Sequence, residues 1–186
     1  LAREAVRDRY GLDWADFAGA LARSPAGNGG GLMLPWFAPE IVPHVSAAKV
    51  IRHELDEGVV EANVRAVIEA QALSSRIHSE WMGVAINSLN VTGGASTNRQ
   101  ILQIFADVHG CPVQPFETTN AAALGAALRA AHGHARARGA AQEWSAVVAP
   151  FTSPPAATRV EPNPAHRRTY DALLASYRAL ESQHAG

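Results

Sequence analysis

Residues 91–100 read VTGGASTNRQ and lie between a short β-prone run at residues 88–92 and a helical pattern that begins at Asn98. Two adjacent glycines, Gly93 and Gly94, stand at this junction between strand and helix. Glycine tolerates positive φ and lets a ligand approach the bare backbone. A helix N-terminus adds unpaired N–H groups and a partial positive charge. The stretch therefore predicts either a tight structural turn or a nucleotide-binding loop.

Helical and extended patterns alternate on both sides of this junction. Upstream, residues 31–37 (GLMLPWF) suit a buried strand. Residues 59–82 then place apolar residues on one side of a helix and charges of alternating sign on the other, which predicts a helix of about 24 residues, ~36 Å long. Downstream, a helix closed by Gly110 is followed by a short strand at 113–116 and an alanine-rich helix at 121–137. This alternation predicts an α/β domain with at least partly parallel strands.

The remaining segments carry weaker signals. Asp13 is a suitable N-cap for a helix that starts with Trp14, whereas residues 40–58 show no clear period and are expected to be loop with some helix. We expect residues 1–150 to form one lobe. Residues 151–164 are then expected to form a proline-rich linker and residues 165–186 a terminal amphipathic helix.

Composition excludes several classes of protein. The 186 residues are 47% hydrophobic and 18% charged, which is typical of a globular protein, and the net charge of -1 shows no basic excess of the kind that nucleic-acid binding requires. No apolar run approaches the ~20 residues that span a bilayer. A single cysteine, Cys111, rules out an intrachain disulfide framework and favours a reducing, cytoplasmic location.

Alternative chemistries lack their motifs. The glycine pair has neither the GxGxxG spacing of a Rossmann fingerprint nor a Walker GxxxxGK[ST] motif, and Lys49 is the only lysine. His132 and His134 resemble a metal-binding pair, but no third ligand is nearby, so a solvated surface is the better interpretation. Asn98 could meet the edge of a purine, because an amide both donates and accepts hydrogen bonds.

The glycine stretch also carries a family resemblance. Residues 92–131, TGGASTNRQILQIFADVHGCPVQPFETTNAAALGAALRAA, resemble the adenosine-binding stretch of the FGGY carbohydrate kinases. In that family a GG-A-x-x-N element precedes a helix, an ADV-x-G-x-PV run follows, and an ALGAA helix comes next. The helical pattern at residues 61–83 resembles the family's long helix. Residues 14–21 (WADFAGAL), 27–30 (GNGG) and 34–43 (LPWFAPEIVP) resemble the branch that acts on D-xylulose.

The resemblance implies an actin-like ATPase, or ribonuclease H-like, α/β fold. The chain would be the C-terminal, nucleotide-binding lobe of a two-lobed sugar kinase, beginning after the first strands of that lobe. ATP with Mg²⁺ would bind between the lobes and phosphorylate a pentulose, with D-xylulose 5-phosphate as the expected product. Ribulose, glycerol and gluconate are the alternative substrates, and a non-catalytic nucleotide-binding module is a further alternative.

The same resemblance implies roles for particular residues. Gly94 and Ala95 would contact the nucleotide through their backbone, with Gly93 giving room. Asn98 would address the adenosine. Trp14 would border the adenine, where stacking is worth ~1–3 kcal/mol, or would instead anchor the core. The family's catalytic aspartate and most of its sugar site lie in the other lobe, so we expect no catalytic residue here and no activity of the chain alone. The sequence is compatible with a homodimer.

Overall fold

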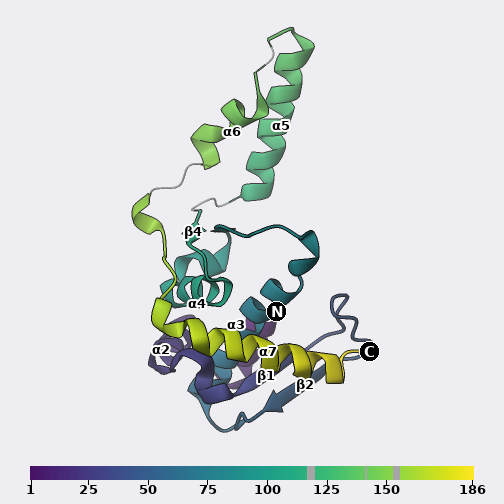
Figure 1. Ribbon diagram of the computed structural model, residues 1–186. Helices are drawn as coiled ribbons and strands as arrows, with labels where there is room; N and C mark the ends of the chain where they lie inside the picture. Colours follow the sequence, from purple (N-terminus) through teal and green to yellow (C-terminus); the bar gives the residue numbers. More distant parts are fainter. Residues whose placement is uncertain (117–119, 141, 153–155) are drawn as a thin grey trace.

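The chain folds into a helical body that contains two short sheets, and one helical hairpin projects from it (Figure 1). The computed structural model describes residues 1–116, 120–140, 142–152 and 156–186. Residues 153–155 of the predicted linker therefore lie outside the described residues. The helices and strands are α1 (Ala2–Arg9), α2 (Trp14–Arg23), β1 (Leu32–Trp36), β2 (Lys49–His53), α3 (Val60–Ile77), β3 (Leu89–Val91), α4 (Arg99–His109), β4 (Val113–Pro115), α5 (Ala121–Ala137), α6 (Trp144–Thr152) and α7 (Arg167–His184).

The first sheet joins β1 and β2 in an antiparallel pair, with Leu32 opposite His53 and Trp36 opposite Lys49. The predicted strand at residues 31–37 is confirmed as β1. The expectation that residues 40–58 contain no strand is wrong, because β2 lies within them. β2 is only half-buried, so its sequence does not show the clear alternation that marks a strand buried on one face.

The second sheet is a parallel pair of β3 and β4, with Leu89 opposite Val113 and Val91 opposite Pro115. Helix α4 connects the two strands and starts after the cap residue Asn98. It ends at Gly110, which adopts the left-handed conformation with φ +67° that glycine accepts without strain. This β–α–β unit confirms the predicted α/β class with parallel strands.

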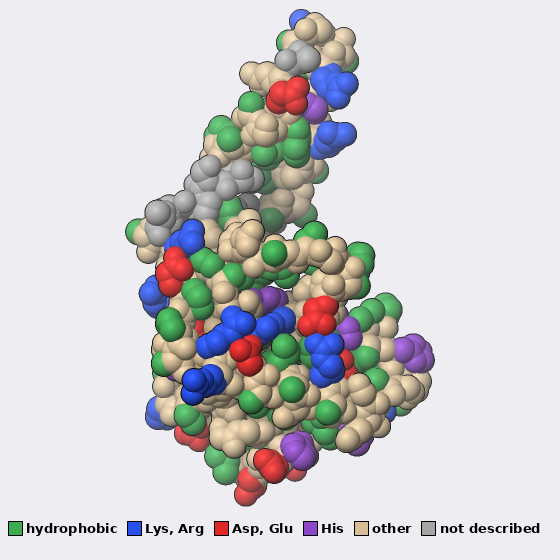
Figure 2. All heavy atoms as spheres, in the orientation of Figure 1, with side chains coloured by type: hydrophobic (Ala, Val, Ile, Leu, Met, Phe, Trp, Pro, Cys, Tyr) green, Lys and Arg blue, Asp and Glu red, His purple; other side chains and the backbone are tan. Residues whose placement is uncertain are grey.

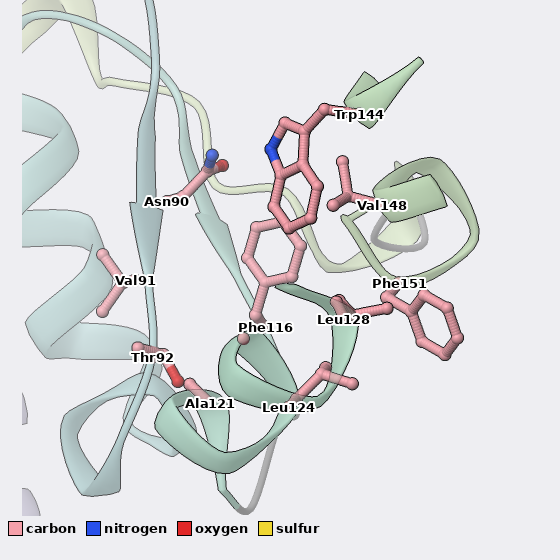
Figure 3. Close-up of a pocket in the computed structure, with 11 residues that line it drawn as sticks. Asn90, Val91, Thr92, Phe116, Ala121, Leu124, Leu128, Trp144, Val148 and Phe151 are labelled. Carbon is pink, nitrogen blue, oxygen red and sulfur yellow. The ribbon is translucent and has the colours of Figure 1, made fainter. Parts of the chain in front are cut away.

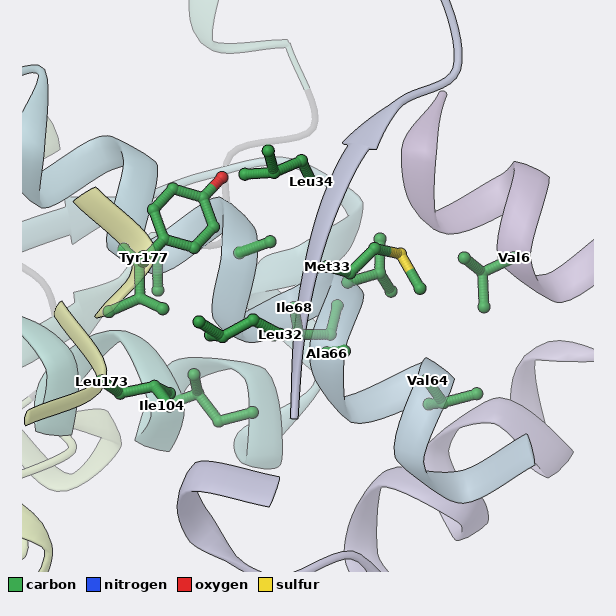
Figure 4. Close-up of a cluster of buried hydrophobic side chains, with 14 of the residues drawn as sticks. Val6, Leu32, Met33, Leu34, Val64, Ala66, Ile68, Ile104, Leu173 and Tyr177 are labelled. Carbon is green, nitrogen blue, oxygen red and sulfur yellow. The ribbon is translucent and has the colours of Figure 1, made fainter. Parts of the chain in front are cut away.

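Helix α3 is the centre of the core. Its apolar side packs against β1, α1 and α2, and α7 also lies against it. Figure 4 shows side chains of α1, α3, α4 and α7 meeting around β1. The fully buried members include Leu34, Ile68, Leu73, Tyr170 and Tyr177. The terminal helix predicted within residues 165–186 is present as α7, and its tyrosines belong to this core.

Two features of α3 differ from the prediction. The helix ends at Ile77 instead of Met82, and Trp81 is 84% exposed instead of lying on the buried side. The charged side is not uniformly solvated either: Arg65 and Glu69 are only 8% and 1% exposed. The i,i+4 ion pair between them exists, with Nε of Arg65 2.7 Å from Oε1 of Glu69, but it is buried.

A polar network compensates for the burial of these charges. The Tyr170 hydroxyl donates to Glu69 Oε1 at 2.8 Å and accepts from Arg65 Nη2 at 2.8 Å. The backbone N–H of Gly27 donates to the same carboxylate oxygen at 2.8 Å. Burial raises the pKa of Glu69, and the neighbouring Arg65 guanidinium opposes that shift. The network thereby joins α3, α7 and the glycine turn that precedes β1.

The projecting hairpin consists of α5 and α6, which pack against each other. His132 of α5 is buried, and its Nε2 lies 3.0 Å from the carbonyl oxygen of Gln142. The Trp144 ring lies edge-on to the His132 ring, and the Arg129 guanidinium lies over the same indole. Hydrophobic side chains remain visible on the surface of the hairpin (Figure 2).

Candidate functional site

A cleft of about 870 Å³ opens where the N-terminus of α4 faces α1 and α2. Trp14 of α2, Gly94 of the glycine loop and Asn98 at the cap of α4 all line it. Arg3 and Glu4 of α1 contribute polar groups to the same cleft. The structure therefore brings together three residues that the sequence places up to 84 positions apart.

The loop between β3 and α4 requires its first glycine. Gly93 has φ +88°, in the region that disfavours side chains. At Gly93 and at Gly94, an added Cβ would meet no heavy atom within 4 Å, so there is open space beside the backbone. The Ser96 hydroxyl donates to the Gly93 carbonyl at 2.7 Å, and the Thr97 hydroxyl donates to the Gly94 carbonyl at 3.1 Å. The loop is thus held by its own side chains while its outer face stays open.

Ala95 lies in the single 3₁₀ turn, Gly94–Thr97, that leads into α4. Sequence reasoning included Ala95 for its backbone but missed Ser96 and Thr97, which fix the loop. A signal was available, because serine and threonine close to a turn often bond to neighbouring backbone groups. Arg3 and Glu4 gave no such signal, since they reach the cleft only through the packing of α1.

Asn98 caps α4. Its Oδ1 accepts hydrogen bonds from the backbone N–H groups of Gln100 at 3.0 Å and Ile101 at 3.1 Å. An amide oxygen has two lone pairs, so the cap occupies its acceptor capacity. Its Nδ2 has no hydrogen-bond partner among the described residues. The expected pairing with a purine, in which the amide both donates and accepts, is thereby reduced to donation.

Trp14 is the first residue of α2 and is 50% exposed. Its ring meets Phe17 edge-on, with centroids 5.6 Å apart, and the Arg7 guanidinium carbon lies 4.5 Å from its centroid. Asp13 fixes the start of the helix, because its side chain accepts from the backbone N–H of Asp16 at 2.7 Å. The half-exposed indole therefore belongs to the wall of the cleft more than to the core.

Within the described residues, no group of three or more His, Cys, Asp and Glu side chains is arranged to hold a metal ion. Cys111 is buried, and burial raises the pKa of its thiol. Of the helices in the described ranges, none is both long enough and apolar enough to cross a membrane. The cleft itself is lined by neutral polar, aromatic, basic and acidic side chains.

Known structures define the class of this fold as the C-terminal lobe of an actin-like sugar kinase. The chain is similar to the xylulose kinase from Rhodospirillum rubrum (TM-score 0.79, 26% identity), covering 98% of this chain and 37% of that one. It is similar in fold to a ligand-bound xylulose kinase from Lactobacillus acidophilus (TM-score 0.82, 20% identity), again over 98% of this chain and 37% of the other. These comparisons confirm the predicted actin-like α/β class.

The chain belongs to the FGGY family of carbohydrate kinases. Residues 1–134 match the model of the family's C-terminal domain. Over 98% of its length the chain is 37% identical to the xylulose kinases of Mus musculus and Rattus norvegicus. It spans about a third of the length of these relatives, covering 34% and 35% of them. The resemblance inferred from residues 92–131 is thereby confirmed.

Proposed function

We propose that this chain provides the ATP-binding lobe of a kinase that converts D-xylulose to D-xylulose 5-phosphate. Similarity to proteins named xylulose kinase over nearly the whole chain supports the choice of sugar. The observation that carries the proposal is the single cleft that unites Trp14, Gly94 and Asn98 at the start of α4. A cytoplasmic location remains part of the proposal.

In this proposal the adenosine lies in the cleft. The Trp14 indole stacks on the adenine, and Nδ2 of Asn98 donates to a ring nitrogen. The bare backbone of Gly94 and Ala95 lets the nucleotide approach closely, and Gly93 supplies the turn that makes this possible. The partial positive charge at the start of α4 favours the negatively charged phosphates.

The metal and the catalytic base come from elsewhere in this proposal. Phosphoryl transfer requires positioning, charge neutralisation and a base for the attacking hydroxyl. Because the part of the chain that the structure describes has no metal-binding cluster, Mg²⁺ would arrive with ATP and be held by its phosphates and by the other lobe. We therefore expect the 186 residues alone to bind nucleotide without phosphorylating sugar.

Nucleotide binding is tested by filling the open space at the loop. Gly94→Val places a branched side chain at the cleft, where an added Cβ would meet no heavy atom within 4 Å and the backbone has no left-handed φ. We expect ADP affinity, measured by calorimetry, to fall at least about tenfold, or ~1.4 kcal/mol. Gly133→Val is the matched control, because Gly133 also has open space around it but lies in α5, outside the cleft. Equal ADP affinity in the two variants, or no binding by the folded wild type, would contradict the proposal.

The catalytic part of the proposal needs a separate measurement. A coupled ADP-release assay of the isolated chain with ATP and D-xylulose should show no turnover. Turnover would mean that the chain carries its own base. The choice among D-xylulose, ribulose, glycerol and gluconate is tested by comparing these four acceptors once the complementary lobe is supplied.

A further inference from the structure

Several side chains of the nucleotide cleft can only donate hydrogen bonds. Asn98 uses Oδ1 for the cap of α4, so its free Nδ2 is a donor. Arg3 and Arg99 also line the cleft, and a guanidinium donates without accepting. The ring nitrogens of adenine are acceptors that suit such donors. The exocyclic amino group of adenine is itself a donor, so it needs an acceptor that none of these three side chains provides.

Glu4 of α1 has a free acceptor at the cleft. It is the one carboxylate among the described residues that line the cleft. A glutamate is ionised at neutral pH, where its carboxylate only accepts hydrogen bonds. Oε2 of Glu4 lies 2.9 Å from the amino group of Leu1, and Oε1 has no hydrogen-bond partner among the described residues. The side chain is 54% exposed, so Oε1 is accessible to a ligand.

Two other side chains of the cleft accept hydrogen bonds without distinguishing between ligand groups. Thr97 and Gln100 both line the cleft. A hydroxyl or an amide can donate as well as accept, so either can bind an amino group or a carbonyl oxygen. A carboxylate binds the amino group and repels the carbonyl oxygen. Glu4 is therefore the described cleft residue that can tell these two groups apart.

A second pocket lacks such a group. This pocket, of about 260 Å³, lies between the end of the parallel sheet and the α5–α6 hairpin, and Figure 3 shows the rings of Phe116 and Trp144 beside it. No charged residue lines it. Asn90 and Thr92 contribute an amide and a hydroxyl, which both donate and accept. Discrimination between an amino group and a carbonyl oxygen is thus a property of the cleft and not of this pocket.

We propose that Glu4 selects adenine over guanine by accepting a hydrogen bond from the exocyclic amino group, while Asn98 donates to the ring nitrogen beside it. This inference rests on the proposed function, which places adenosine in the cleft. Guanine carries a carbonyl oxygen where adenine carries the amino group, so the carboxylate would face another acceptor and repel it. Stacking on Trp14 tolerates any base, because every base has a π-face. Selection therefore falls to the edge of the base.

The contact is tested by calorimetric titration with adenosine and with purine riboside, which lacks the exocyclic amino group. The wild type should bind adenosine roughly fivefold more tightly than purine riboside, because one hydrogen bond to a carboxylate is lost. Glu4→Ala should bind the two nucleosides equally, through a loss of adenosine affinity alone. A purely structural role of Glu4 would weaken both nucleosides together. Neither ligand carries a phosphate, so the lost negative charge does not alter a repulsion between carboxylate and phosphate.

Guanosine tests the repulsive part of the proposal. The wild type should prefer adenosine to guanosine at least about tenfold. Glu4→Gln keeps the shape of the side chain, but its amide can donate to the carbonyl oxygen, so this preference should narrow roughly fivefold. Asp16→Asn is the matched control, because Asp16 is an exposed carboxylate in the first turn of α2 and does not line the cleft. It should leave both preferences unchanged.

The outcomes separate this inference from the proposed function. Adenosine binding without a preference over purine riboside, or with a preference that survives Glu4→Ala, would overturn the role of Glu4 and leave the nucleotide site standing. A variant Glu4→Ala that loses only its preference for adenosine over 2′-deoxyadenosine would assign Glu4 to the ribose, and would also overturn the inference. Absence of both adenosine and ADP binding to the folded wild type would refute the proposed function and the inference together.

Discussion

Asn98 has two roles that a single substitution can separate. Its Oδ1 caps α4 through Gln100 and Ile101, and its Nδ2 is the donor proposed for the adenine. Asn98→Asp keeps an acceptor of the same shape at the cap and removes the donor. Aspartate and asparagine are about equally good N-caps. A negative charge at a helix N-terminus is itself stabilising by ~0.3–1 kcal/mol.

The expected effects follow from these contacts. The free energy of unfolding of Asn98→Asp should stay within about 1 kcal/mol of the wild type. Loss of one hydrogen bond to the base should weaken binding by about 1–2 kcal/mol, or roughly 5- to 30-fold. Asn98→Ala removes both roles, and it should cost ~1 kcal/mol of stability in addition to the same loss of affinity.

The assay is calorimetric titration with adenosine alongside thermal unfolding. Adenosine carries no phosphate, so repulsion between the new carboxylate and the phosphates of ADP does not contribute. Wild-type affinity for adenosine in Asn98→Asp would refute the donor role. If Asn98→Ala alone weakened binding, the residue would act only by holding the helix.

Two further predictions concern buried polar groups. Tyr170→Phe removes the hydroxyl that bridges Arg65 and Glu69. The free energy of unfolding, measured in urea, should fall by ~1–3 kcal/mol. A decrease below about 0.5 kcal/mol would mean that the network does not stabilise the fold. Burial, aided by Arg76, lowers the pKa of His109 to about 4. Below pH ~6.5 the unfolded chain binds a proton that the folded chain excludes, so stability should fall by up to about 3 kcal/mol between pH 6.5 and 4. In His109→Phe, stability should change less between pH 6.5 and 4 than it does in the wild type. Parallel stability profiles for the variant and the wild type would mean that His109 does not cause the loss of stability.

The parts of the fold that the sequence predicted well are those set by local signals. Gly93 has the positive φ that glycine tolerates in the turn before α4, and Gly110 ends the helix as predicted. The strand β2 was missed because pairing with β1 defines it, and pairing is a tertiary event. The charges of α3 were expected on a solvated side because nothing near Arg65 and Glu69 in the sequence reveals that Tyr170 will cover them.

The candidate site shows the same difference between features set by local sequence and features set by tertiary packing. The loop at residues 93–98 could be proposed from its own residues, whereas the association of Trp14 with it came only from family resemblance. Arg3 and Glu4 could not have been identified, because their place in the cleft depends on how α1 docks on α3. The cap bonds of Asn98 were likewise invisible before the structure, and they alter what the side chain can offer a ligand.

The hydrogen bonds of Tyr170 to Arg65 and Glu69 also affect how the chain folds during translation. Tyr170 is separated by 105 positions from Arg65 and by 101 from Glu69. During translation, the guanidinium and carboxylate must wait for α7 to leave the ribosome before their interior partner arrives. A nascent chain that is released before α7 has been made would keep a charged groove where the folded protein has a sealed interior. Quality-control proteases could recognise that difference.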